Sequence, residues 1–269
     1  MNLTKTLISR LSVALPLLFA SSLGQAGIIG QWTFDGPNPL ADSTGHFGSL
    51  QLVGNASIAN GMLTVDGAGT SQSGWARAAT YAGPTITNKT LVVWASLTGL
   101  SNAANAGSLM TIDRIGSDHF DGIVFGEMQA NGWVSGSSNW GRTQGFNPGY
   151  TETGINTLIQ MAFSYQDLGG GQVRVSGYRN GTAIGSYVSG GIGSWNAGDT
   201  EILFGIRHVG GMTGPGALDA LLSEARLYDV ALTQQEIAAL SMNSVPEPGS
   251  LALLGLGLLG LALRKRRKA

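Results

Sequence analysis

The chain has 269 residues, a formal net charge of −1 and only 12% charged side chains. This charge excludes the basic field that nucleic-acid binding requires, so we expect no nucleic-acid partner. The absence of cysteine excludes disulfide bonds, thiolate metal sites and a thiol nucleophile. The 42 glycines, together with frequent Ser, Thr and Asn, are typical of a secreted β-protein that is rich in turns.

Residues 1–26 have the organisation of a secretory signal peptide. Lys5 and Arg10 form a positive n-region, residues 11–20 an apolar h-region, and Gly24-Gln25-Ala26 a small-x-small cleavage site. We expect cleavage after Ala26; an uncleaved anchor is the alternative, although the h-region is short for one. The following segment, residues 27–243, is long enough for one hydrophobic core and is predicted to form a single domain.

The middle of the chain has the patterns of β-strands. In Leu158–Tyr165, apolar residues alternate with Gln160, Ala162 and Ser164, which predicts a half-buried strand. Residues 201–207 alternate in the same way. Thr90–Leu97 is apolar on both faces, which is typical of a central strand, and we expect Trp94 to lie in the core.

Turn sequences connect these strands. Asn-Gly, the strongest short hairpin signal, occurs at residues 60–61, 131–132 and 180–181, and the last pair predicts a hairpin between residues 172–178 and 182–188. A single helix is expected at residues 233–240, because Thr233 and Glu236 form a capping box. Many short strands with glycine-containing turns predict an all-β protein, an antiparallel β-sandwich of jelly-roll type.

The order of these segments resembles the concanavalin A-like, laminin G-like jelly roll over roughly residues 27–241. The segments that carry the resemblance are 30–36, 41–52, 62–69, 90–97, 159–165, 178–186 and the closing stretch 217–240. The spacing departs from the family at residues 99–142, where we expect an insertion rich in Gly, Ser and Asn.

Laminarinase-type enzymes share this fold, and the resemblance implies that they place two carboxylates at alternate positions of one strand to flank the glycosidic bond. Glu127 and Glu224 each lack such a partner, and we expect Glu224 and Arg226 to form an exposed pair on one face of the closing strand. The sequence therefore predicts no catalytic residues and a protein that is not an enzyme. The alternatives are a glycan-active hydrolase whose carboxylates converge only in three dimensions, and a ligand-free matrix scaffold.

Aromatic residues cluster in a stretch, residues 131–150, that has the composition of a loop. Trp133, Trp140, Phe146 and Tyr150 lie there with polar side chains such as Arg142. Because aromatic rings on polar loops stack against sugar rings, we predict a carbohydrate-contacting rim formed by Trp133, Trp140, Arg142 and Tyr150. The alternative is that these rings only fill the edge of the sandwich.

The laminin G-like resemblance also implies a structural calcium ion, which would be held by carboxylate and carbonyl oxygens. The candidate ligands are Asp35 and Asp42 near the first strand and Asp219 on the closing strand. The alternative is that these aspartates cap their own backbone in turns.

The end of the sequence has three parts: the triplet Pro246-Glu247-Pro248, an apolar run from Leu251 to Leu263, and a basic cluster. The cluster contains Arg264, Lys265, Arg266 and Arg267. As a helix the apolar run spans about 20 Å, which is short for a hydrocarbon core of about 30 Å. The basic cluster is expected to stay on the cytoplasmic side of the membrane, so that the body of the protein lies outside.

These three parts, residues 244–269, resemble the PEP-CTERM sorting signal of Gram-negative bacteria that make exopolysaccharide. The resemblance implies that an exosortase recognises Pro246, Glu247 and Pro248 and removes the tail during export. It also implies a location in the cell envelope, on the cell surface or in the extracellular matrix, with exopolysaccharide or another glycan as a partner. Anchoring in the inner membrane is then transient; an ordinary tail anchor is the alternative.

Overall fold

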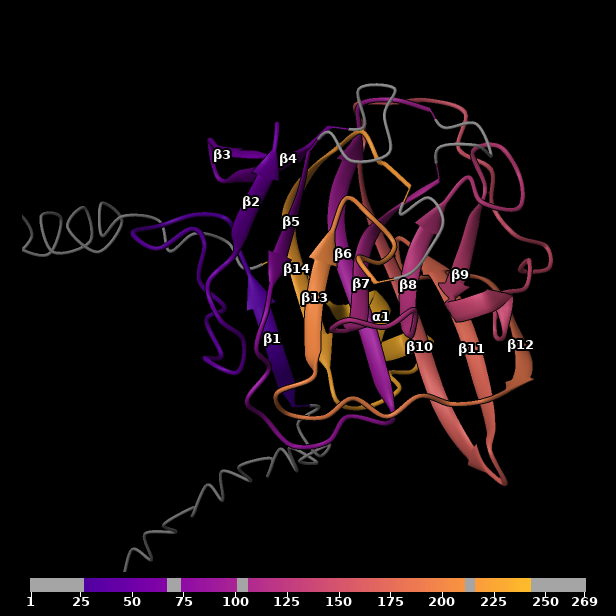
Figure 1. The fold of residues 1–269 in the computed structure, drawn as a ribbon. Helices are drawn as coiled ribbons and strands as arrows, with labels where there is room; N and C mark the ends of the chain where they lie inside the picture. Colours follow the sequence, from indigo (N-terminus) through magenta and orange to yellow (C-terminus); the bar gives the residue numbers. More distant parts are fainter. Residues whose placement is uncertain (1–26, 67–73, 101–105, 211–215, 243–269) are drawn as a thin grey trace, which may run out of the picture.

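The computed structural model of the protein describes residues 27–66, 74–100, 106–210 and 216–242. These residues form two antiparallel sheets packed face to face (Figure 1), so the predicted all-β sandwich is confirmed. The predicted signal peptide and the C-terminal apolar run lie outside the described residues. Within the described ranges, no helix has both the length and the apolar character that a membrane span needs.

The first sheet has eight strands and the second has six. In spatial order the first contains β12 (Thr182–Gly190), β11 (Gln172–Arg179), β10 (Leu158–Gly169), β6 (Lys89–Leu97), β14 (Ala220–Tyr228), β4 (Met62–Val65) and β3 (Ser57–Ala59), and β1 (Ile28–Trp32) also pairs with β14. The second contains β2 (Gln51–Gly54), β5 (Gly74–Ala78), β13 (Thr200–Phe204), β7 (Gly107–Arg114), β8 (Phe120–Phe125) and β9 (Trp133–Ser137).

Strand β10 is buried on both faces over most of its length, so the prediction of a half-buried strand is wrong. Met161 and Phe163 face the main core between the sheets, whereas Ala162 joins Trp94 in a second cluster on the outer face. Helix α1 (Gln234–Ala239) supplies Ile237 to that cluster. The outer face is therefore a second apolar layer, and the predicted core position of Trp94 lies in this layer.

The helix and two of the hairpins that local sequence signals predicted are confirmed. Thr233 caps α1, and its hydroxyl accepts from the backbone N–H of Glu236 while the Glu236 carboxylate accepts from Thr233, which completes the capping box. Asn180 and Gly181 have φ angles of 50° and 72° between β11 and β12, the positive values that such a two-residue turn requires. Asn60 and Gly61 connect β3 and β4 in the same way.

Where the structure describes it, the segment 99–142, in which an insertion was predicted, is part of the second sheet. This segment forms the adjacent strands β7, β8 and β9 of the second sheet, and nearly all of their residues are buried. Its small residues serve close packing: a Cβ atom at Gly122 would lie 2.6 Å from Thr111 Oγ1, and one at Gly136 would lie 2.3 Å from Val124 Cγ2. A Gly- and Ser-rich composition therefore indicates tightly packed strands here.

A buried cluster of charges, Lys89–Asp121–Arg142, lies between the two sheets. Lys89 Nζ is 2.8 Å from Asp121 Oδ2, and Arg142 Nε is 2.8 Å from Asp121 Oδ1. Burial lowers the pKa of Lys89, although Asp121 opposes this effect. Burial alone would raise the pKa of Asp121, but Lys89 and Arg142 hold it below its ordinary value. The cluster thus ties β6 of one sheet to β8 of the other.

Candidate functional site

Two surface pockets share Tyr150, which lines both of them. The first, the Met128 pocket, has a volume of about 190 Å³, and the second, the Arg179 pocket, about 180 Å³. The Met128 pocket is lined by Met128, Gln129, Gly132, Trp133, Val134, Gly145, Phe146, Pro148, Gly149, Tyr150 and Thr151. The Arg179 pocket is lined by Leu97, Tyr150, Glu152, Thr153, Gly154, Thr157, Ile159 and Arg179.

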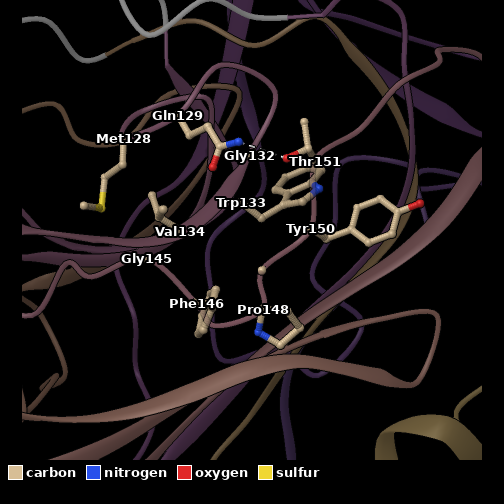
Figure 2. A pocket seen from close by; sticks show the side chains of 11 residues that line it. Met128, Gln129, Gly132, Trp133, Val134, Gly145, Phe146, Pro148, Tyr150 and Thr151 are labelled. Carbon is tan, nitrogen blue, oxygen red and sulfur yellow. Dashed lines mark hydrogen bonds between the residues drawn. The ribbon is translucent and has the colours of Figure 1, made fainter.

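Backbone pairing holds the two segments of the Met128 pocket together. Gly132 forms an isolated β-bridge with Thr151, and the backbone N–H of Glu152 donates to the carbonyl of Asn131 at 2.9 Å. The Gln129 side-chain amide also donates to the Thr151 hydroxyl at 3.2 Å, a contact that is drawn in Figure 2. The loop before β9 and the segment that carries Tyr150 are thus fixed relative to each other.

A buried carboxylate holds the Tyr150 side chain in place through an arginine. Glu152 accepts from Arg179 Nε and Nη2 at 2.7 and 3.0 Å, and from the indole N–H of Trp133 at 2.9 Å. The Arg179 guanidinium lies over the Tyr150 ring, 4.3 Å from its centroid, in the geometry of a cation–π contact. The hydrogen bonds to Glu152 raise the pKa of Arg179. Arg179 therefore stays positively charged while its guanidinium lies over the Tyr150 ring.

The structure separates the four residues of the predicted rim into two groups. Tyr150 and Trp140 are 41% and 55% exposed, as ring stacking requires. Trp133 and Arg142 are only 2% and 5% exposed, so they are not parts of an exposed rim, contrary to the prediction. The reason is that residues 131–150 are not all loop: Trp133 begins strand β9, where its ring packs against Phe125 at a centroid distance of 4.6 Å.

Trp140 and Tyr150 are also at different places on the surface. Trp140 ends the short 3₁₀ helix η2 (Ser138–Trp140) and lines neither pocket. In Figure 2, Tyr150 lies at one edge of the Met128 pocket, and its hydroxyl group points away from the other labelled side chains. Phe146, which is buried, lines the same pocket. The alternative that some of the rings fill the sandwich edge therefore holds for Trp133 and Phe146.

Three residues of the site, Gln129, Glu152 and Arg179, were not among those predicted from the sequence. Gln129 and Glu152 flank the aromatic stretch, so a wider window around Trp133 and Tyr150 would have included them. Arg179 ends strand β11, far from Tyr150 in the sequence, and its guanidinium reaches the Tyr150 ring only in the folded chain. No local sequence signal indicates this contact.

Two of the predicted calcium ligands, Asp35 and Asp42, accept hydrogen bonds from backbone N–H groups, and the backbone carbonyl of the third, Asp219, accepts from the N–H of Thr98 at 2.9 Å. The Asp42 carboxylate accepts five hydrogen bonds at 2.7–3.0 Å, from the backbone N–H groups of Gln31, Thr44, His46 and Phe47 and from the Thr44 hydroxyl. Asp35 accepts from the backbone N–H of Gly36. Ca²⁺ requires six to eight oxygen ligands, and no three His, Asp or Glu side chains of the described residues gather as a metal site. For Asp42 the alternative, a cap on its own backbone, is confirmed.

The carboxylates considered for hydrolysis all have structural partners. Glu127 is paired with Arg207. Glu224 and Arg226 share one face of β14 and are 2.6 Å apart, but the prediction that they are exposed is wrong, because the outer layer covers them. There the Arg226 guanidinium lies 4.7 Å from the Trp94 ring centroid, and its Nη2 donates to the Ser241 carbonyl.

One pair of carboxylates does converge in three dimensions, away from both pockets. Asp113 on β7 and Glu201 on β13 are register partners, which places their side chains on the same face of the second sheet. Both are buried, and Glu201 is paired with Arg77 at 2.6 Å. Asp113 accepts a long hydrogen bond of 3.3 Å from the backbone N–H of Val209, and burial dominates its environment. This pair therefore does not flank a surface cleft.

Burial, with a smaller contribution from Glu201, raises the pKa of Asp113 from 3.8 to about 8. Because the pKa of Asp113 is higher in the folded state than in the unfolded state, the folded protein binds the proton of this carboxyl group more tightly. The contribution of Asp113 to the free energy of unfolding is therefore largest below pH 4 and is lost as the pH rises to 8. We expect Asp113→Asn to remove a slope of up to about 1.4 kcal/mol per pH unit between pH 5 and 8. Urea unfolding at several pH values measures it; parallel pH profiles of the two proteins would contradict the assignment.

Comparison with known proteins supports the fold and the tail. Residues 244–267 match the model of the PEP-CTERM protein-sorting motif. No curated protein matches the sequence. Domain 4 of AbnA, a GH43 extracellular arabinanase from Geobacillus stearothermophilus solved in complex with arabinotriose, superposes with a TM-score of 0.55 and 19% identity, over 79% of this chain and 97% of that domain.

Two botulinum neurotoxin domains have the same fold. The binding domain of serotype D/C has a TM-score of 0.56 and 14% identity, over 78% of this chain and 50% of that one. The type G receptor binding domain has a TM-score of 0.55 and 13% identity, over 79% and 50%. The chain thus spans about half the length of these toxin domains, and identities this low show the fold alone. The chain therefore combines an antiparallel β-sandwich of the kind found in these domains with a PEP-CTERM protein-sorting motif at residues 244–267.

Proposed function

We propose that this protein is exported, sorted by its PEP-CTERM tail, and binds a glycan without catalysis through the surface around Tyr150. The proposal of glycan binding rests on the position of Tyr150. Its ring is exposed, lines two pockets and is held by Arg179 and Glu152. Rigid aromatic rings beside neutral polar groups suit the alternating apolar faces and hydroxyl groups of sugars.

Two of the structural neighbours were solved with sugars, which supports this choice of ligand class. The arabinanase domain was in complex with arabinotriose, and a botulinum neurotoxin DC binding domain was in complex with SialylT. These ligands were bound by those proteins. For this chain they suggest only that its sandwich is a binding module.

The test is a glycan array probed with the full-length protein in mild detergent. The proposal predicts reproducible binding to at least one polysaccharide or oligosaccharide class. Binding to none of the classes on the array would overturn the glycan half of the proposal and leave a ligand-free scaffold as the function of the sandwich.

Removal of the tail by an exosortase is the second half of the proposal. We expect the exported protein to end before Leu251, and the mass of its C-terminal peptide measures this end. Replacing the triplet Pro246-Glu247-Pro248 by three alanines is expected to prevent processing, because the triplet would be the recognised element. An exported wild-type protein that retains residues 251–269 would contradict exosortase processing.

A further inference from the structure

We propose that two successive units of an uncharged glycan chain lie across Tyr150, one in the Met128 pocket and one in the Arg179 pocket. This inference rests on the proposed glycan-binding function and specifies its ligand class. The first observation is that the two pockets share Tyr150 and have similar volumes, about 190 and 180 Å³. Each is smaller than the roughly 300 Å³ at which small-molecule pockets begin, so each fits a single small unit, and Tyr150 joins them.

The charges around the pockets select an uncharged chain. Among the residues that the structure describes, no Asp, Glu, Lys or Arg lines the Met128 pocket. The Arg179 pocket contains one charge of each sign, and these are joined to each other by two hydrogen bonds between Arg179 and Glu152. A uronate carboxylate would therefore lose water without gaining an unpaired cation, which is unfavourable.

The uncharged polar groups at the pockets suit hydroxyl groups. Gln129 and Thr151 are exposed at the Met128 pocket, and Thr153 and Thr157 are exposed at the Arg179 pocket. Amide and hydroxyl side chains both donate and accept hydrogen bonds, as sugar hydroxyl groups do. Buried apolar side chains also line both pockets, among them Phe146 in the first and Ile159 in the second.

Two glycines allow each pocket to be filled separately. A Cβ atom at Gly145, in the Met128 pocket, or at Gly154, in the Arg179 pocket, would meet no atom within 4 Å, and neither residue has a positive φ angle. Leucine is therefore sterically allowed at both positions and would add bulk to the lining of each pocket. Gly190, at the end of β12, has equally open surroundings and lines neither pocket, so Gly190→Leu is the matched control.

The experiment titrates the full-length protein with linear uncharged pentose and hexose oligosaccharides of one to six units, and with oligogalacturonides as acidic probes. We expect a disaccharide of the preferred uncharged sugar to bind at least tenfold more tightly than its monosaccharide, and acidic oligomers to bind at least tenfold more weakly. Gly145→Leu and Gly154→Leu should each reduce disaccharide affinity at least tenfold, while Gly190→Leu leaves it unchanged.

Each other result has a defined meaning. Equal affinity for monosaccharide and disaccharide, or full affinity in one of the two filled variants, would overturn the two-unit arrangement while the proposed function stands. Preferential binding of oligogalacturonides would overturn the uncharged class in the same way. If neither uncharged nor acidic oligosaccharides bind, both this inference and the proposed function fail.

Discussion

Replacing Asp121 by alanine is expected to lower the free energy of unfolding by about 3–5 kcal/mol, the cost of leaving buried charges without their partner. Asp121 is fully buried and is the anion to which both Lys89 and Arg142 are paired at 2.8 Å. Its removal leaves two cations between the sheets, where burial already lowers the pKa of Lys89. Since domains of this kind are stable by roughly 5–15 kcal/mol, the loss is a large share of the total.

Urea unfolding of the variants measures this cost. Asp121→Asn keeps the size of the side chain and part of its hydrogen bonding, so its loss should be smaller but still clear. Asp167→Ala is the control for removing an exposed carboxylate: Asp167 lies near the end of β10 and its side chain accepts one hydrogen bond, from the backbone N–H of Gly169 at 2.8 Å, so we expect a loss of only about 1 kcal/mol. A loss below about 1 kcal/mol for Asp121→Ala would show that the two cations find other partners or water.

Replacing Tyr150 by alanine is expected to weaken glycan binding at least tenfold, which corresponds to about 1.4 kcal/mol. Tyr150 is the residue common to both pockets, and Arg179 fixes its ring. The variant therefore removes both the ring proposed to stack on a sugar and the side chain that the two pockets share. Isothermal titration with a glycan that binds the wild-type protein measures the change, and unfolding curves check that the fold is kept.

Two further variants separate the aromatic ring from other effects. Tyr150→Phe keeps the ring and the contact with Arg179, so it should retain most of the affinity. Trp140→Ala removes the other exposed ring of the predicted rim, which lines neither pocket, and should bind like the wild type. Loss of binding in Trp140→Ala with normal binding in Tyr150→Ala would move the site to η2.

The fold was largely predictable because its signals are local. Period-2 alternation and a run apolar on both faces identified β10 and β6, the Asn180-Gly181 turn identified the β11–β12 hairpin, and Thr233 with Glu236 identified α1. The burial of Glu224 and Arg226 depends instead on the segment that follows β14 and folds back over it. The alternation along β14 could not indicate that contact.

The candidate site was predictable only in part, because exposure depends on strand pairing. Trp133 and Tyr150 lie in the same stretch of sequence, yet Trp133 is in a buried strand and Tyr150 is exposed beyond it. The partner of Tyr150, Arg179, comes from a distant hairpin. Asp42 is of a residue type that often binds metal ions, but its carboxylate accepts hydrogen bonds from nearby backbone N–H groups.

Glycan binding at Tyr150 is tested most directly by NMR of protein labelled only in its tyrosine rings, during titration with a bound oligosaccharide. The chain has six tyrosines, and Tyr150 is the exposed one while Tyr81, Tyr165, Tyr178 and Tyr228 are buried and Tyr187 is half-buried. We predict that the ring signals of Tyr150 shift with saturation while those of the buried tyrosines stay in place. Saturable binding that leaves the Tyr150 signals unchanged would contradict the site.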